Sequence, residues 1–186
     1  NTATTNAISY LRKQYKIPFV GVEPAIKPAS LTSTTNSIGV LATKGTLSSS
    51  LFHETSKQYS RGKNLIEQQG TGIVELIESG QLHSYEMKKL ITKYLTPMKN
   101  NNIDCLVLGC THYNFLKPIL KKLLSKDVTV IDSCAAIACQ TKRVLKKSKL
   151  LNKKKTKVKH EFYTNGSKEI MADLMGWDPS IIQKLY

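Results

Sequence analysis

The sequence predicts an α/β protein with mainly parallel sheets. Short apolar strand candidates alternate with amphipathic helical segments almost throughout the chain, which is typical of this class. Two of the strand candidates end in small polar loops of the same design, LATKGT and LGCTHY. With 186 residues, of which 40% are hydrophobic, the chain is long enough for one large domain or two small ones with a real core.

The first expected element is a helix that follows Asn1 and Thr2, which resemble its cap. Its apolar residues recur at helical spacing on one face: Ala3, Ala7, Ile8, Leu11 and Tyr15. Later strands are expected at residues 17–22, 37–43, 103–109, 128–133 and 160–164. Later helices are expected at residues 47–59, 84–98, 113–125, 134–147 and 167–175. Residues 24–30 contain two prolines and indicate a crossing between subdomains.

The formal net charge of +15 is concentrated in one segment. Residues 142–159 contain ten Lys or Arg and no acidic residue. Such a run indicates either a solvated basic surface or a nucleic-acid site. The run has no interleaved aromatic residues for base stacking and no nucleic-acid motif, so the solvated surface is favoured.

The cysteine count and the chain start bear on the compartment. Four cysteines are few for a disulfide scaffold of this length, so we expect reduced thiols. No apolar run approaches the length of a membrane span, and NTATTNAISY lacks the basic start and apolar core of a secretory signal. We therefore expect a cytoplasmic protein without a membrane partner.

Polar side chains gather where the expected strands and helices meet. In open parallel sheets, ligands bind at the carboxyl ends of the strands. Residues 1–4, 42–46 and 109–112 offer an amide, several hydroxyls, a thiol and an imidazole at such positions, together with free N–H groups of helix starts. These groups suit a small anion such as a carboxylate.

Cys110 is the most informative residue of this set. It lies between a strand end and a helix start, with His112 two residues later, which is a setting that stabilises a thiolate. The alternative is a buried structural cysteine, the usual role of a cysteine within an apolar run. Cys105 fits that alternative, whereas Cys110 follows the glycine that ends the run, so we interpret Cys110 as reactive.

Metal binding is a weaker interpretation of the cysteines. Cys105 and Cys110, and again Cys134 and Cys139, have C-x4-C spacing. Zinc sites usually have tighter spacings in loops, and two residues five apart on a helix do not share a face. We therefore expect no metal site.

Other catalytic signals are weak or absent. Glu75 and Glu78 can share one helix face, but charged pairs on helices are most often solvated. The sequence has no phosphate-binding loop, no GxGxxG after a strand and no GxSxG. Nucleotide-dependent and hydrolase activities thus lack their usual signals.

Taken in order, several segments resemble the cofactor-independent glutamate racemases of bacterial cell-wall synthesis. NTAT at 1–4 resembles the NTA segment of that family, IPFVGVEPAIKPA its inter-domain stretch, GVLATKGT its substrate loop and LVLGCTHY its second catalytic motif. VTVIDSCAAIA and FYTNGS are similar to its later segments. GCTH with an upstream GVLAT-x-GT is the specific part, since aspartate and hydantoin racemases differ after the cysteine. Asn114 departs from the family, which often has proline there.

The resemblance implies a two-base proton transfer at the α-carbon of glutamate, with one cysteine on each face and no cofactor. Such an enzyme supplies D-glutamate for peptidoglycan. Cys110 would serve the face used for L-glutamate, with His112 assisting it and Glu78 as the family's assisting acid. The implied substrate-binding residues are Asn1, Thr2, Thr43, Thr46, Thr111 and His112.

The resemblance also implies two doubly wound α/β domains with the site between them. Residues 28–138 would be the second domain, and residues 1–27 with 139–186 would be the remainder of a first domain truncated at its N-terminal side. The family's first catalytic cysteine precedes the NTA segment, and this sequence begins at Asn1, so we expect the 186-residue chain to be inactive. The sequence leaves a homodimer open.

A second hypothesis is a basic protein that reuses the racemase-like fold to bind nucleic acid. It depends on residues 142–159 alone. Binding to duplex DNA that weakens steeply with added salt would favour it.

Overall fold

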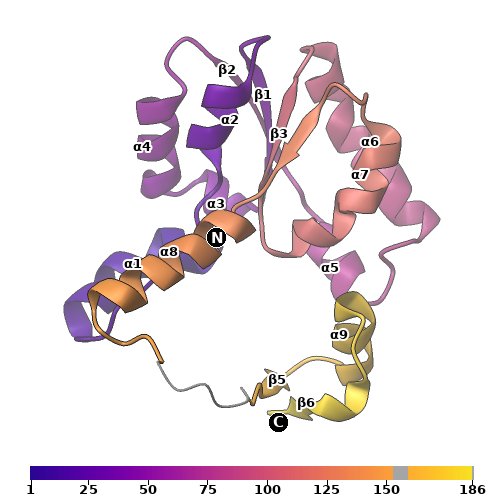
Figure 1. Cartoon of the computed structure of the whole chain (residues 1–186). Helices are drawn as coiled ribbons and strands as arrows, with labels where there is room; N and C mark the ends of the chain where they lie inside the picture. Colours follow the sequence, from indigo (N-terminus) through magenta and orange to yellow (C-terminus); the bar gives the residue numbers. More distant parts are fainter. Residues whose placement is uncertain (153–158, 186) are drawn as a thin grey trace.

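The computed structural model describes residues 1–152 and 159–185. Its main body is a four-stranded parallel sheet with strand order β2-β1-β3-β4 and helices on both faces (Figure 1). The strands are β1 (Ser37–Ala42), β2 (Asn64–Gln69), β3 (Cys105–Gly109) and β4 (Thr129–Ile131). The predicted α/β class with parallel strands is confirmed.

Alternation along the strands divides the core into two layers. Leu106 and Leu108 of β3 pack with α5 (Ile73–Glu78), α6 (Tyr85–Asn100) and α7 (Lys117–Leu123). Cys105 and Val107 face the opposite side, where they pack with α2 (Ile26–Thr32) and α4 (Ser50–Tyr59). Burial of both faces explains why β3 is apolar at every position.

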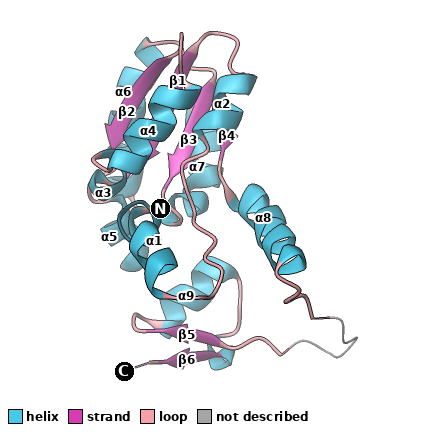
Figure 2. Cartoon of the chain, turned by 90° about the vertical axis from the view of Figure 1, so that its left-hand side faces the viewer, coloured by secondary structure: helices cyan, strands magenta, loops and turns pink. Residues whose placement is uncertain are grey.

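The remaining elements lie at the carboxyl ends of the strands (Figure 2). They are α1 (Thr2–Gln14), the one-turn α3 (Lys44–Leu47) and 3-10 helix η1 (His112–Leu116), and α8 (Cys134–Lys147). A small βαβ unit follows, in which β5 (Phe162–Thr164) pairs in parallel with β6 (Ile182–Lys184) around α9 (Lys168–Met175) and η2 (Pro179–Ile181). Within the described chain no helix has the length and apolarity needed to cross a membrane.

Three segments differ from the sequence-based expectations. Residues 17–22, expected as a strand, have no regular structure and pair with no other strand among the described residues. Strand β2 was not expected because NLIEQQ is polar; it tolerates these residues since it lies at the edge of the sheet. The helix expected at 113–125 is divided into η1 and α7, whose first turn contains Pro118.

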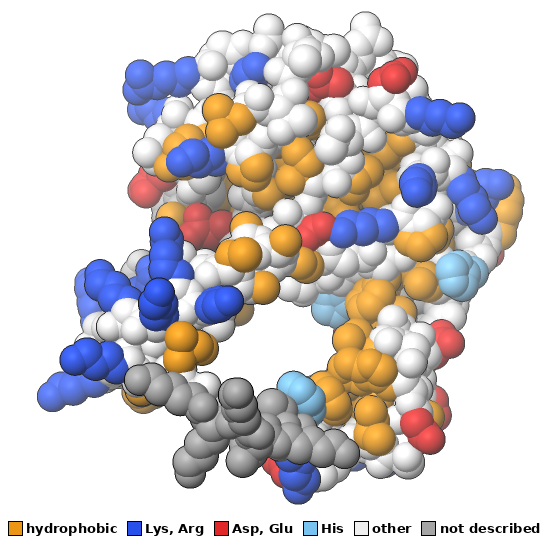
Figure 3. Space-filling view, viewed as in Figure 1, with side chains coloured by type: hydrophobic (Ala, Val, Ile, Leu, Met, Phe, Trp, Pro, Cys, Tyr) orange, Lys and Arg blue, Asp and Glu red, His pale blue; other side chains and the backbone are white. Residues whose placement is uncertain are grey.

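Basic side chains gather over α8 on one face of the molecule (Figure 3). Lys142, Arg143, Lys146 and Lys147 are exposed, and no residue of α8 is fully buried. Residues 153–158 of the basic run lie outside the described residues. A solvated surface is consistent with these exposures, and the nucleic-acid hypothesis stays a prediction.

Candidate active site

The polar loops after β1 and β3 are neighbours at one edge of the sheet. Ala42 and Gly109, the last residues of these strands, are paired in register. Gly109 is required by this approach, because a Cβ atom there would lie 2.6 Å from the Cβ of Ala42. The pairing places Thr43 and Cys110, which follow the two strands, at the same end of the sheet.

A thiol, an imidazole and a carboxylate form a chain of contacts at this end. The Sγ of Cys110 lies 4.0 Å from Nδ1 of His112, and Nε2 of His112 lies 2.5 Å from Oε1 of Glu78. Cys110 follows β3, His112 begins η1 and Glu78 ends α5. We call these three residues the Cys110–His112–Glu78 relay.

The next residue in the chain, Tyr113, anchors the relay in the fold. Its backbone N–H donates to the carbonyl of Cys110 at 3.2 Å, which closes the turn between the two relay residues. Its buried hydroxyl donates to the carbonyl of Gly70 at 3.0 Å. Gly70 must lack a side chain, because a Cβ atom there would lie 2.3 Å from that hydroxyl. These two hydrogen bonds of Tyr113 therefore fix the turn that presents Cys110 and His112.

The electrostatics of the relay favour a positively charged imidazole. The hydrogen bond with Cys110 raises the pKa of His112 to about 9; burial opposes the rise and the hydrogen bond with Glu78 adds to it. His112 is therefore protonated at neutral pH. A positive charge beside the Cys110 sulfur stabilises negative charge on that sulfur.

Replacing Glu78 with glutamine is expected to lower the pKa of His112 by about one pH unit, because the charge partner of the imidazolium is removed. An NMR titration of the His112 ring protons measures this shift. Glu75→Gln on the same helix is the matched control and is expected to leave the pKa unchanged. An unchanged pKa in Glu78→Gln would contradict the proposed contact.

The raised pKa of His112 has a consequence for stability. A His whose pKa is higher in the folded state than in the unfolded state stabilises the fold. For His112 this contribution is fully present at pH values below the unfolded pKa of about 6.5 and is lost as the pH rises through the folded pKa of about 9. Because the side chains of His112 and Glu78 are 31% and 55% exposed, solvent screening keeps the contribution small.

Three threonine hydroxyls meet at the same edge of the sheet as the relay, where α1 begins against α3. The Oγ1 of Thr2 lies 2.7 Å from that of Thr43 and 3.2 Å from that of Thr46, and the latter two are 3.1 Å apart. Gly45 permits this contact, since a Cβ there would lie 2.7 Å from the Thr2 side chain. The structure thus brings together three predicted substrate-binding residues that lie up to 44 positions apart in the chain.

A cavity of about 320 Å³ is lined by other residues that the sequence analysis assigned to the site. Asn1, Cys110 and Thr111 line it, and the side-chain oxygen of Asn1 is buried without a hydrogen-bond partner. Cys110 is 8% exposed and faces this space. Sequence reasoning did not assign Asn114 and Cys134 to the site, although both line the same cavity.

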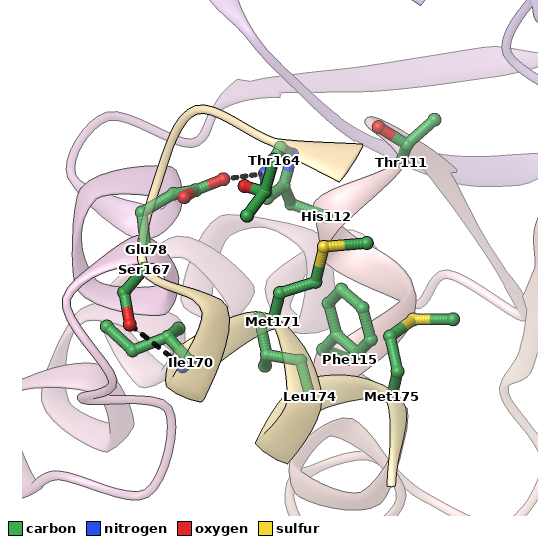
Figure 4. Close-up of a pocket in the computed structure, with 10 residues that line it drawn as sticks. All are labelled: Glu78, Thr111, His112, Phe115, Thr164, Ser167, Ile170, Met171, Leu174 and Met175. Atoms are coloured by element: carbon green, nitrogen blue, oxygen red, sulfur yellow. Dashed lines mark hydrogen bonds and ion pairs between the residues drawn. The ribbon is translucent and has the colours of Figure 1, made fainter. Parts of the chain in front are cut away.

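A second cavity, of about 310 Å³, lies on the other side of the relay (Figure 4). Glu78, Thr111 and His112 form part of its wall. The rest of the wall comes from Phe115 and from β5 and α9: Thr164, Ser167, Ile170, Met171, Leu174 and Met175. In the sequence, this part of the wall is marked by FYTNGS, a strand followed by a small polar loop. Only the tertiary structure shows that this segment lies near η1.

The described residues contain no group of three His, Cys, Asp or Glu side chains arranged to hold a metal ion. Cys105 is buried within β3, and burial raises its pKa to about 11. Cys134 and Cys139 are exposed on α8. The groups found at this site are a cysteine with a paired imidazole, together with hydroxyl and amide side chains.

A family model and curated relatives both match this chain to amino-acid racemases. The family model described as Asp/Glu/Hydantoin racemase matches residues 1–141. The chain is 38% identical over 166 residues to a glutamate racemase from Herpetosiphon aurantiacus, covering 89% of this chain and 65% of that protein. It is 42% identical over 152 residues to one from Pseudomonas syringae, covering 81% and 55%. The chain thus spans 55–65% of the length of these relatives.

Solved structures show the same relationship. The Escherichia coli glutamate racemase in complex with L-glutamate and the activator UDP-MurNAc-Ala matches with a TM-score of 0.81 at 28% identity. The match covers 98% of this chain and 70% of that one. A glutamate racemase isoform from Bacillus anthracis matches with a TM-score of 0.80 at 26% identity, covering 98% and 69%.

Proposed function

This chain belongs to the Asp/Glu/hydantoin racemase family, and on that premise we propose that it forms one side of the active site of a glutamate racemase. The observation that carries the proposal is the Cys110–His112–Glu78 relay at the end of β3, at the same edge of the sheet as the threonine hydroxyls of the β1 loop. In this proposal residues 28–138 form one racemase domain, and residues 1–27 with 139–186 belong to the other.

Cys110 is the base or acid on one face of the substrate. Its thiolate takes the α-proton of L-glutamate, and the electron pair left on the α-carbon is delocalised into the adjacent carboxylate. A second cysteine, on the opposite face, returns a proton and inverts the centre. His112 stabilises the thiolate, and Glu78 positions His112 and stabilises its charge.

The substrate is held by neutral donors around the thiol. Asn1, with its unpartnered side-chain oxygen, suits the ammonium group. The hydroxyls of Thr2, Thr43, Thr46 and Thr111, with backbone N–H groups and His112, suit the two carboxylates. Donors aimed at the α-carboxylate stabilise the negative charge that develops there, so that no metal or pyridoxal cofactor enters the scheme. We further propose that the product, D-glutamate, serves peptidoglycan synthesis in the cytoplasm.

The test uses a polypeptide that joins residues 1–186 to the part of the racemase fold that the relatives have and this chain does not span. In D₂O without pyridoxal phosphate, this protein is expected to place deuterium on the α-carbon of glutamate, measured by mass spectrometry. A folded protein that introduces no deuterium into either enantiomer would refute the proposal.

A further inference from the structure

Two cysteines follow adjacent strands at matching distances. Strands β3 and β4 are parallel neighbours, and Val107 pairs with Ile131. Cys110 comes three residues after Val107, and Cys134 comes three residues after Ile131. Neighbouring strands lie about 4.8 Å apart, and a disulfide joins Cα atoms that are about 4.4–6.8 Å apart. The register therefore brings the loops that carry these two thiols to the same edge of the sheet.

The two thiols also share a space. Cys110 and Cys134 both line the cavity of about 320 Å³ at the end of β3, and both are free. Cys134 begins α8, and no residue of α8 is fully buried. The first turn of α8 therefore has no fully buried side chain to hold it away from Cys110. Cys139 lies five residues further on the same helix and does not line the cavity.

The two thiols differ chemically. Cys110 lies beside the imidazole of His112, which favours a nucleophilic sulfur. Partial burial raises the pKa of Cys134, and the nearby Asp132 carboxylate raises it further, which favours the protonated thiol. Redox-sensitive cysteine pairs have this arrangement: one thiol reacts first with the oxidant, and the second thiol then reacts with the oxidised sulfur.

We propose that Cys110 and Cys134 form a reversible disulfide when the protein meets a peroxide. The Cys110 thiolate attacks one peroxide oxygen and the O–O bond breaks. Cys110 becomes a sulfenic acid, and the departing oxygen takes a proton from the His112 imidazolium or from solvent and leaves as water or an alcohol. The Cys134 sulfur then attacks the sulfenic sulfur, and the sulfenic oxygen leaves as water with the Cys134 proton. The disulfide protects Cys110 from irreversible oxidation. Its effect on racemisation rests on the proposed function, whereas its formation does not.

Thiol titration and peptide mapping of the reduced 186-residue chain after hydrogen peroxide treatment test this directly. The free thiols are expected to fall from four to two per chain and to return with dithiothreitol. Trypsin leaves Cys105 with Cys110 in one peptide and Cys134 with Cys139 in another. The Cys139→Ser variant is therefore mapped as well, and is expected to form the same cross-link between the two peptides.

The Cys134→Ser variant separates the proposed pair from general oxidation. It is expected to lose the cross-link and to accumulate sulfenic acid at Cys110, trapped by dimedone, whereas the unaltered chain and Cys139→Ser show little adduct. Equal dimedone labelling of Cys110 with and without Cys134, or a cross-link that Cys139→Ser removes, would overturn the proposal. Because these experiments follow thiols and not glutamate, they can fail or succeed independently of the racemase proposal.

Discussion

Serine at position 110 is expected to reduce α-proton exchange by roughly a thousandfold in the polypeptide that joins residues 1–186 to the rest of the racemase fold. A positioned acid or base contributes about 10²–10⁴ in rate, and a serine hydroxyl beside a protonated His112 is a far weaker base than a thiolate. The substitution changes one atom at an 8% exposed site, so we expect the fold and glutamate binding to be retained. Deuterium incorporation and calorimetric glutamate binding, measured together, separate loss of chemistry from loss of binding.

Cys139→Ser is the matched control for Cys110→Ser. Cys139 is exposed on α8 and does not line the cavity, so its replacement is expected to leave exchange unchanged. If Cys110→Ser exchanged the α-proton within a few-fold of the unaltered protein, Cys110 could not be the base. If both variants lost exchange equally, the effect would be structural.

The 186-residue chain by itself is expected to racemise neither enantiomer of glutamate. Inversion by two bases needs one base on each face of the α-carbon. The other thiol that lines the Cys110 cavity is Cys134, and the two follow adjacent parallel strands, so both approach from the same side. In the proposed scheme the described residues therefore supply a thiol to one face of the substrate only.

Polarimetry of D- and L-glutamate solutions with the purified chain checks this expectation. Far-ultraviolet circular dichroism and a cooperative thermal transition show whether the chain is folded during the assay. Adding, as a separate polypeptide, the part of the racemase fold that the relatives have and this chain does not span is expected to give activity if the two parts associate. Optical rotation that decays at an enzymatic rate with the folded chain alone would contradict the expectation.

Local sequence was sufficient to predict the strands that are formed by continuous apolar runs. β1 and β3 are continuous apolar runs, and both were predicted within two residues of their bounds. Strand β2 was missed because its residues are polar and its strand conformation comes from pairing with β1. Residues 17–22 are as strand-like as β1 in composition but have no partner strand in the described chain, and the prediction there was wrong.

The candidate site also contains some residues that the local sequence predicted and others that only the tertiary structure brings close. Cys110 and His112 are two residues apart, so their proximity follows from the chain itself, and the glycine before Cys110 indicated that the apolar run ends there. Glu78 lies 34 residues from His112, and only the family resemblance pointed to it. The contact exists because the end of α5 packs against η1, which the sequence does not encode in any local pattern.

The sequence by itself thus determined the fold class, the strands with apolar runs and the thiol–imidazole pair, since each depends on neighbouring residues. The tertiary structure alone decided which distant groups come near that pair. Glu78 contacts His112, Cys134 lines the same cavity as Cys110, and the loop with Thr43 and Thr46 follows β1 at the same edge of the sheet. The physical reason is register. Hydrogen bonding between β3 and its neighbours sets which loops lie together at the edge of the sheet, and burial of both faces of β3 holds that register in place.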